Sequence, residues 1–425
     1  MTFAIHTFGC KVNIYESEYV TNLLLENNFQ MLDFNSDKEA DIYIINTCTV
    51  TNEADKKDRK LIHTTKNSHK NSILIVMGCY SQLKPNDIDA DIVIGNKYKS
   101  EIISLINEFK DSHQKIIKIE DIRKTDFEDM YINRFLTHTR AFVKIQDGCN
   151  AFCAYCAIPY ARGGIRSKDS DKVISEVTNL VNNGYKEIVL TGIHTGRYGI
   201  DKHTNLEKLL TELLKIPNIF RIRLSSIEIN EITDGIIDLI KNNDIMAKHL
   251  HIPLQSGSNT ILKNMNRLYD KETFIKRVAE IRKEIPDISI TTDLILGFPG
   301  ETNEMYQETL ATLNEIKFTK IHTFPYSKRS GTKAASMTNQ IDGNIKKCRV
   351  KEVIGLSNKY ELEFYKQKKG NIYNGIIETR KDGKKVVITT NYIPIEVITN
   401  MENNHEVNVK ITEIKDESIK GDIIV

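Results

Sequence analysis

Three cysteines lie close together near the middle of the chain: Cys149, Cys153 and Cys156, here called the central triad. Their C-x3-C-x2-C spacing can place three thiolates on a 4Fe–4S cluster, whereas a cluster held wholly by protein takes four cysteines. The next cysteine downstream is Cys348, so the fourth iron is expected to accept a non-protein ligand. S-adenosylmethionine can chelate such an iron through its amino and carboxylate groups, and an electron then cleaves it to a 5′-deoxyadenosyl radical.

Zinc binding and redox dithiol chemistry are the alternatives for a C-x2-C pair. A structural zinc site usually needs four ligands, and the sequence offers only one such pair of cysteines here. His194 and His203 are too distant along the chain to complete a standard zinc finger with it. The spacing therefore favours an iron–sulfur cluster.

Three more cysteines, Cys10, Cys48 and Cys79, form a second pattern, here called the amino-terminal triad. Each ends an apolar run typical of a β-strand, and helix-like segments lie between the runs. Alternating strands and helices predict a parallel sheet, whose strands present their carboxyl ends at one edge. The sequence thus predicts that these thiols converge on a second cluster. Three separate buried thiols are the alternative, although Gly9 and Gly78 favour loop positions.

The expected fold class is α/β, in three domains. Residues 1–112 are expected to form a flavodoxin-like parallel sheet, residues 135–366 a partial (βα)6 barrel, and residues 367–425 a small all-β barrel. A polar connector is expected near 110–139. The barrel strands are predicted at 141–145, 187–190, 221–225, 248–252, 289–296 and 320–324. The central triad directly follows the first of them, and active sites of such barrels lie at the carboxyl ends of the strands.

The composition excludes several classes of protein. The net charge is +2, with 27% charged and 40% hydrophobic residues, as in an ordinary globular protein. The longest apolar runs have the length of a strand, and no secretory signal is recognisable, so no membrane association is expected. Cysteines in ligand-like settings fit a reducing cytoplasm.

Basic residues gather at the entrance to the last segment. They are Lys366, Lys368, Lys369, Arg380, Lys381, Lys384 and Lys385. Such a run is usually a solvated face, and contact with nucleic acid is the alternative.

Further motifs follow one another along the chain. They occupy residues 9–13, 46–51, 78–82, 147–163, 190–196, 251–258 and 293–301. In their order and joint occurrence they resemble the radical S-adenosylmethionine methylthiotransferases, over essentially the whole chain. The last segment is similar to a TRAM domain, a small RNA-binding β-barrel.

Three branches of that family are possible. Residues 7–13, 194–196 and 325–332 look most like the branch that acts on N6-threonylcarbamoyladenosine, beside the anticodon of tRNA. The sister branches act on isopentenyladenosine in tRNA or on an aspartate of a ribosomal protein. One departure is Lys333, where that branch is expected to have proline.

The resemblance implies that the two triads have different functions. The central triad would be catalytic and hold the 4Fe–4S cluster that binds and cleaves S-adenosylmethionine. The amino-terminal triad would hold a second 4Fe–4S cluster, whose open iron carries the sulfur to be transferred. One S-adenosylmethionine methylates sulfur, and another supplies the radical that removes hydrogen from carbon 2 of the adenine ring.

Polar residues at the predicted strand ends are candidates for contacts with S-adenosylmethionine. Thr191 and Gly192 resemble the family segment that receives the methionyl amino group, and a glycine lets backbone approach a ligand closely. Other candidates for contacts with ribose, carboxylate or adenine are Ser225, Glu228, Gln255 and Asp293. A strand-end polar residue without a ligand is the alternative for each of these four.

The expected partners are the anticodon loop of tRNA, an electron donor and a sulfur donor whose identities the sequence does not reveal. A non-catalytic iron–sulfur RNA-binding protein is one alternative, but it leaves the glycine-lined strand ends of a six-unit barrel unexplained. A zinc-stabilised RNA-binding protein is another.

Overall fold

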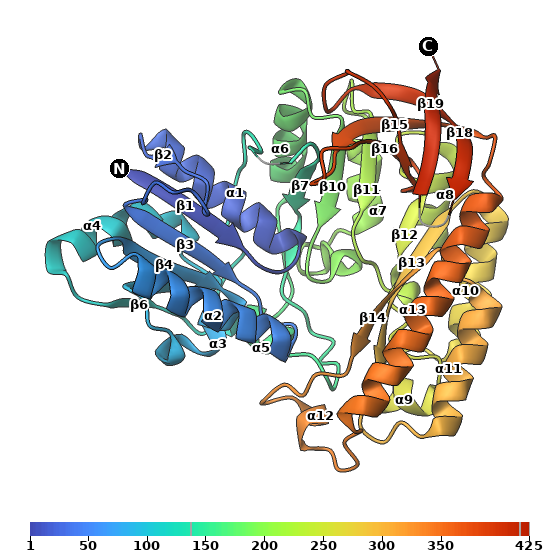
Figure 1. The fold of residues 1–425 in the computed structure, drawn as a ribbon, viewed down its shortest axis with the longest axis horizontal. Helices are drawn as coiled ribbons and strands as arrows, with labels where there is room; N and C mark the ends of the chain where they lie inside the picture. The colour runs from blue at the N-terminus through green and yellow to red at the C-terminus, as the bar shows by residue number, and fades with distance from the viewer. Residues whose placement is uncertain (137, 416–417, 425) are drawn as a thin grey trace.

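The computed structural model describes residues 1–136, 138–415 and 418–424. An amino-terminal α/β part lies beside a partial barrel, and a small closed barrel caps one end of the partial barrel (Figure 1). Within the described residues, no helix is long and apolar enough to cross a membrane.

The amino-terminal sheet has six parallel strands in the order β2-β1-β3-β4-β5-β6. Its 2-1-3-4-5 order is that of flavodoxin-like folds, as predicted. The strands are β1 (Thr2–Thr7), β2 (Gln30–Met31), β3 (Ile42–Thr47), β4 (Ile73–Gly78), β5 (Ile92–Ile94) and β6 (Ile116–Lys118). Strand β6 lies in the segment expected to be a polar connector.

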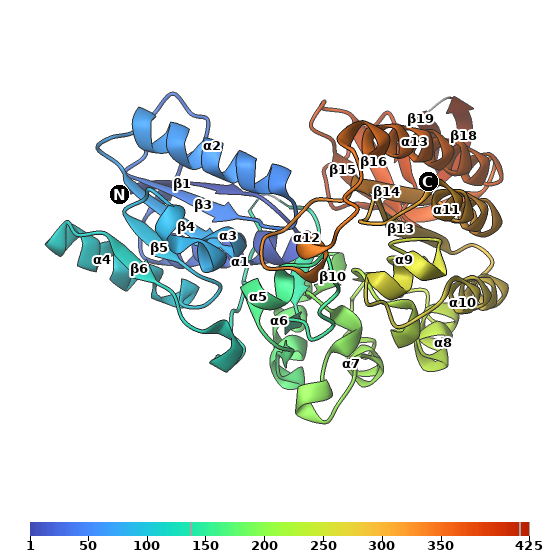
Figure 2. The ribbon, with the colours of Figure 1, turned by 90° about the horizontal axis from the view of Figure 1, so that it is seen from below.

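Helices cover both faces of this sheet, as the view from below shows (Figure 2). Alternate side chains of β3 enter opposite cores: Ile44 packs with α1 and α4, and Tyr43 packs with α2 and α3. Every residue of β3 is buried, which explains why its sequence is a continuous apolar run. The four helices are α1 (Lys11–Glu26), α2 (Asn52–Ser68), α3 (Cys79–Leu83) and α4 (Ile102–Ser112).

The partial barrel has six parallel strands, and their bounds lie close to those predicted from the sequence. They are β7 (Ala141–Lys144), β10 (Glu187–Thr191), β11 (Arg221–Leu224), β12 (His249–His251), β13 (Ser289–Leu296) and β14 (Lys320–Pro325). They pair as two three-stranded sheets, which isolated parallel bridges between β11 and the β12 region join. The barrel is partial: α1 packs against β7 at one edge, and helix α13 (Gly343–Lys366) packs against β14 at the other.

Amphipathic helices cover the outside of the barrel and bury their apolar sides against its strands. They are α6 (Ser170–Asn182), α7 (Leu206–Leu213), α8 (Asp234–Asn242), α10 (Lys271–Glu284) and α11 (Asn303–Ile316). Shorter elements are β8 (Gln146–Asp147), α5 (Ile158–Arg162), β9 (Arg166–Ser167), α9 (Asn259–Asn264) and α12 (Lys333–Ser336).

The last five strands close into a small barrel in the order β15-β16-β17-β19-β18, which confirms the predicted all-β part. They are β15 (Ile372–Thr379), β16 (Lys385–Thr389), β17 (Pro394–Glu396), β18 (Glu406–Lys415) and β19 (Ser418–Ile424). Strand β19 was not anticipated from the sequence. Arg221 and Arg223 of β11 hold the small barrel by donating hydrogen bonds to backbone carbonyls of its β16 end, at 3.1 and 3.2 Å.

Candidate functional site

The amino-terminal triad gathers at one edge of the first sheet. Cys10, Cys48 and Cys79 follow β1, β3 and β4, which are neighbouring strands. Burial raises the pKa of the Cys48 thiol to about 12, and the nearby thiols of Cys79 and Cys10 add to the shift. The three side chains therefore lie within electrostatic reach of one another, as the strand-end argument predicted.

Two glycines allow these loops to pack so closely. Gly9 and Gly78 both have a φ of +104°, in the region that side chains disfavour. A Cβ on Gly9 would lie 3.1 Å from the sulfur of Cys48, and one on Gly78 would lie 2.5 Å from the carbonyl oxygen of Thr47. Asn13 completes the packing, because its side-chain amide donates to the same Thr47 carbonyl at 2.8 Å.

The central triad lies on the loop between β8 and α5. The backbone amide of Cys149 donates to the carbonyl of Gly163 at 2.9 Å, and that of Cys156 donates to Cys153 at 3.0 Å. Burial raises the pKa of the Cys156 thiol to about 12, and Cys153 and Cys149 raise it further by charge repulsion. The Cys156 thiol therefore needs a nearby cation to become a thiolate.

Both triads fit the donor set of a 4Fe–4S cluster with an open iron. Each supplies three thiols on loops held by backbone hydrogen bonds or tight glycine packing. Among the residues that the structure describes, no three His, Cys, Asp or Glu side chains are grouped closely enough to hold a single metal ion. A 4Fe–4S cluster held wholly by protein takes four cysteines, so three thiols would leave one iron open.

A buried arginine joins the neighbourhoods of the two triads. Arg162, at the end of α5, donates from Nε to the sulfur of Cys79 at 3.2 Å and from Nη1 to Glu16 at 2.7 Å. It also contacts Asp147, which precedes the central triad, at 3.2 Å. Burial opposes the charge of Glu16, but Arg162, Lys99 and Lys144 outweigh it and lower the pKa of Glu16 to about 2.

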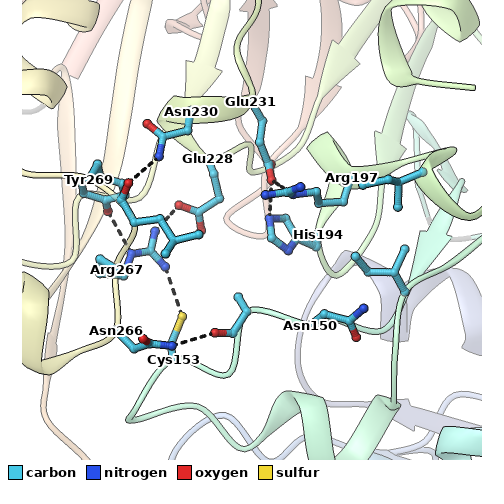
Figure 3. Close-up of a pocket in the computed structure, with 14 residues that line it drawn as sticks. Asn150, Cys153, His194, Arg197, Glu228, Asn230, Glu231, Asn266, Arg267 and Tyr269 are labelled. Carbon is cyan, nitrogen blue, oxygen red and sulfur yellow. Dashed lines mark hydrogen bonds and ion pairs between the residues drawn. The ribbon is translucent and has the colours of Figure 1, made fainter.

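A cavity of about 310 Å³ opens beside the central triad (Figure 3). On one wall, Arg267 donates to the sulfur of Cys153 at 3.4 Å and forms an ion pair with Glu228. Its Nε donates to the hydroxyl of Tyr269 at 3.1 Å. These contacts place a fixed positive charge next to a thiol of the triad.

On the facing side of this cavity, His194 lies against Glu231 at 2.8 Å (Figure 3). Its other ring nitrogen lies 3.3 Å from the sulfur of Cys149. Burial opposes a charge on the imidazole, but hydrogen bonds to Cys149 and Glu231 outweigh burial and raise the pKa of His194 to about 10. Both partners thus favour a positive charge on this imidazole, which lies beside Cys149 as Arg267 lies beside Cys153.

A second cavity, of about 170 Å³, lies between Cys156 and the loop that follows Cys48. Val50 and Thr51, which follow Cys48, line it together with Cys156 of the central triad. Aromatic side chains also line it, among them Tyr155, Phe324 and Tyr326. The side-chain oxygen of Gln255, which lines the same cavity, is buried and has no hydrogen-bond partner among the described residues. We call this space the inter-triad cavity. It offers aromatic surface and a free hydrogen-bond acceptor, the side-chain oxygen of Gln255, near the sulfur of Cys156.

The six candidate contacts for S-adenosylmethionine fall into two sets. Glu228 lines the cavity beside the central triad, and Gln255 and Asp293 line the inter-triad cavity. Thr191, Gly192 and Ser225 line neither cavity. Ser225 lies 3.0 Å from the hydroxyl of Thr195, and Gly192 packs against Gln146. Their role as ligand contacts stays a prediction.

Three charged residues of the site were not predicted from the sequence. His194 and Arg162 lie within motifs at 190–196 and 147–163, so the motifs themselves could have drawn attention to them. Arg267 lies in no motif, and only the folded chain brings it to Cys153.

Family models match two stretches of the chain. Residues 143–313 match the radical SAM superfamily, and residues 2–96 match the uncharacterized protein family UPF0004. These stretches contain the central triad and the amino-terminal triad, respectively.

Curated relatives match over nearly the whole chain. The threonylcarbamoyladenosine tRNA methylthiotransferase MtaB of Bacillus subtilis is 43% identical, over 93% of this chain and 90% of the relative. The protein of that name from Aquifex aeolicus is 38% identical, over 93% and 96%. The tRNA-2-methylthio-N(6)-dimethylallyladenosine synthase of Thermoanaerobacter pseudethanolicus is 35% identical, over 99% and 92%.

Solved structures support the fold. The radical S-adenosylmethionine methyltransferase TsrM of Kitasatospora setae, with cobalamin and a 4Fe–4S cluster bound, superposes with a TM-score of 0.57. The match covers 79% of this chain and 74% of that one, at 14% identity. At this identity the similarity concerns the fold alone.

Proposed function

Because this chain belongs to the radical S-adenosylmethionine tRNA methylthiotransferases, we propose that it transfers a methylthio group to carbon 2 of N6-threonylcarbamoyladenosine, next to the anticodon of tRNA. The choice of base rests on the relatives: those at 43% and 38% identity are named for this nucleoside, and the dimethylallyladenosine synthase is at 35%.

One observation carries the proposal: the inter-triad cavity is lined by Cys156 of the central triad and by Val50 and Thr51, which follow Cys48 of the amino-terminal triad. A base placed there would lie between a thiol of the central triad and the loop that follows Cys48. Tyr155 and Phe324 line the same space, and aromatic side chains bind unpaired bases by stacking. The geometry suits a reaction that brings sulfur and a reactive carbon to one ring.

The cofactors of this proposal are S-adenosylmethionine and two 4Fe–4S clusters, held by Cys149, Cys153 and Cys156 and by Cys10, Cys48 and Cys79. When bound, they supply a carbon radical and the sulfur to be transferred. The chain's own residues hold and shield this chemistry. Arg267 and His194 place positive charge beside the thiols of the central triad, and Arg162 does the same for Cys79.

Residues 367–425, the small barrel, are proposed to bind the anticodon arm. Lys369 and Lys381 are exposed on it and have no ion-pair partner in the described part of the chain. Phosphate contacts from such residues position RNA without reading its sequence. An electron donor and a sulfur donor are also required, and the cytoplasm is the compartment where tRNA would be met.

Nucleoside mass spectrometry of bulk tRNA, from cells with and without the gene, tests the proposal. We expect the 2-methylthio form of threonylcarbamoyladenosine to disappear without the gene, and to return with the wild-type gene but not with a Cys149→Ala copy. Loss of the 2-methylthio group from isopentenyladenosine instead would overturn the proposed base. Unchanged tRNA would overturn the proposed reaction.

A further inference from the structure

A third cavity, of about 370 Å³, lies inside the partial barrel and is lined from all three parts of the molecule. Lys11 reaches it from α1, Tyr392 from the turn after β16, and His249, His251 and His322 from β12 and β14. Figure 1 shows how the small barrel covers this end of β11 and β12. We call this space the lumen cavity.

The lumen cavity has hydrogen-bonding groups that the protein itself does not use. His249 is 6% exposed, and its Nδ1 is buried with no hydrogen-bond partner among the described residues. Its Nε2 lies 3.2 Å from the hydroxyl of Thr291, which also meets His251 at 2.9 Å. The ring centroids of His251 and His322 are 5.6 Å apart. A polar wall of this kind calls for a polar occupant.

The charges around the lumen cavity leave one cation without a partner. Lys320 forms an ion pair with Glu361 in the wall, and His251 Nε2 lies 3.3 Å from the carboxylate of Asp293. Lys11 lines the same space and has neither a hydrogen bond nor an ion pair with any residue that the structure describes. Burial lowers the pKa of Lys11, and Tyr392 and Glu187 only partly oppose this shift.

The surrounding carboxylates do not supply the missing partner. Glu187 is shared by Arg221 and Arg223, at 3.2 and 2.7 Å, and Glu378 is paired with Arg140 at 2.8 Å. Each acidic group near the lumen cavity is thus already engaged with a base. An anion from outside the chain would complete the charge balance.

The lumen cavity adjoins the proposed reaction site in two ways. Lys11 directly follows Cys10 of the amino-terminal triad. Asp293, the partner of His251, lines the inter-triad cavity. The ion pair between His251 and Asp293 thus joins the walls of the two cavities, and a substituent that passes this pair would meet the histidines and Lys11.

We propose that the lumen cavity binds the carboxylate end of the N6 substituent of the substrate base, with Lys11 as its ion-pair partner. This inference rests on the proposed function and identifies the part of the protein that selects the base. The threonylcarbamoyl group carries a carboxylate and a hydroxyl, which match Lys11 and the free nitrogen of His249. An isopentenyl group offers neither, so it would leave both groups buried without partners, and sites built for hydrogen bonds reject such analogues strongly.

The test compares two anticodon stem-loop RNAs that differ in one charge. One carries threonylcarbamoyladenosine as the free acid, and the other carries its methyl ester. Their dissociation constants from the full-length, cluster-reconstituted protein with S-adenosylmethionine are measured for wild type, Lys11→Met and Lys11→Arg. Because breaking a desolvated charge pair has a large effect on binding, we expect wild type to prefer the acid by about 30-fold. Lys11→Met should show almost no preference, and Lys11→Arg should keep most of it.

A second variant lies away from the cysteines. His249→Phe keeps a ring beside Tyr392 but removes the free nitrogen, so it should weaken binding of the acid and the ester alike. Iron content and the electron paramagnetic resonance spectrum of each variant show whether both clusters are retained. An undiminished preference for the acid in cluster-loaded Lys11→Met would overturn the inference. If the wild type does not methylthiolate the stem-loop that carries the free acid, the proposed function fails instead, whatever the Lys11 variants show.

Discussion

The guanidinium of Arg162 donates to the sulfur of Cys79 at 3.2 Å, across the boundary between the partial barrel and the amino-terminal sheet. The same side chain is fully buried and binds Glu16 of α1. Since Arg162 lies six residues after Cys156 on the continuation of its loop, one arginine fixes the position of one triad relative to the other.

Replacing Arg162 by glutamine should destabilise the protein by about 3–5 kcal/mol, because a buried carboxylate at Glu16 would lose its main partner. Urea unfolding of the cluster-free proteins measures the change. Arg123→Gln is the matched control, since Arg123 is exposed and, among the residues that the structure describes, forms an ion pair only with Asp121. Arg123→Gln should leave the free energy of unfolding unchanged, and a similar loss in both variants would refute a special role for Arg162.

Glu187 should make stability depend on pH in acid. Burial opposes its charge, but Arg223, Arg221 and Arg140 lower its pKa from 4.5 to about 2. A lowered native pKa contributes stability that is fully present above about 4.5 and is lost as the pH falls toward 2. The free-energy difference between wild type and Glu187→Gln should therefore be large at pH 7 and shrink between pH 4.5 and 2. Glu212→Gln, at an exposed helical position, should show no such change.

Single-cysteine variants should separate the two clusters. Cys48→Ala should lose about half of the reconstituted iron, since each cluster holds four irons, and still cleave S-adenosylmethionine to 5′-deoxyadenosine. Cys149→Ala should lose a similar amount of iron and lose cleavage. Cys348→Ala is the control, because Cys348 is exposed and lies on α13, outside both triads. Full iron content in Cys48→Ala would show that the amino-terminal triad holds no cluster.

Removing charge from the small barrel should weaken RNA binding in a salt-dependent way. The double variant Lys369→Gln/Lys381→Gln should bind an anticodon arm less tightly. The slope of log K against log salt should fall by roughly one to two units, since each phosphate contact contributes about 0.9. Lys276→Gln on α10, exposed on another face, should bind as wild type does. If wild type, the double variant and Lys276→Gln all gave the same slope of log K against log salt, the RNA would bind at a surface other than the one that carries Lys369 and Lys381.

Much of this architecture follows from local sequence. The spacing of Cys149, Cys153 and Cys156 is a property of one loop, so it could be interpreted without the fold. The alternation of apolar strands and helices determined the parallel sheet and the six barrel strands, because each strand carries its own burial pattern. The convergence of Cys10, Cys48 and Cys79 followed from the same logic, since parallel strands end at one edge.

What the sequence left open depends on neighbours that are distant along the chain. Strands β6 and β19 are short or half-polar, and their pairing partners define them. The strand-end positions of Thr191 and Ser225 were predictable, but Asp293, expected at a strand end, lies within β13. The cavity that each side chain meets depends on loop conformation. Only the tertiary structure brought Arg162 to Cys79 and Lys11 into the barrel, because both contacts cross from one folded part to another and no local pattern records them.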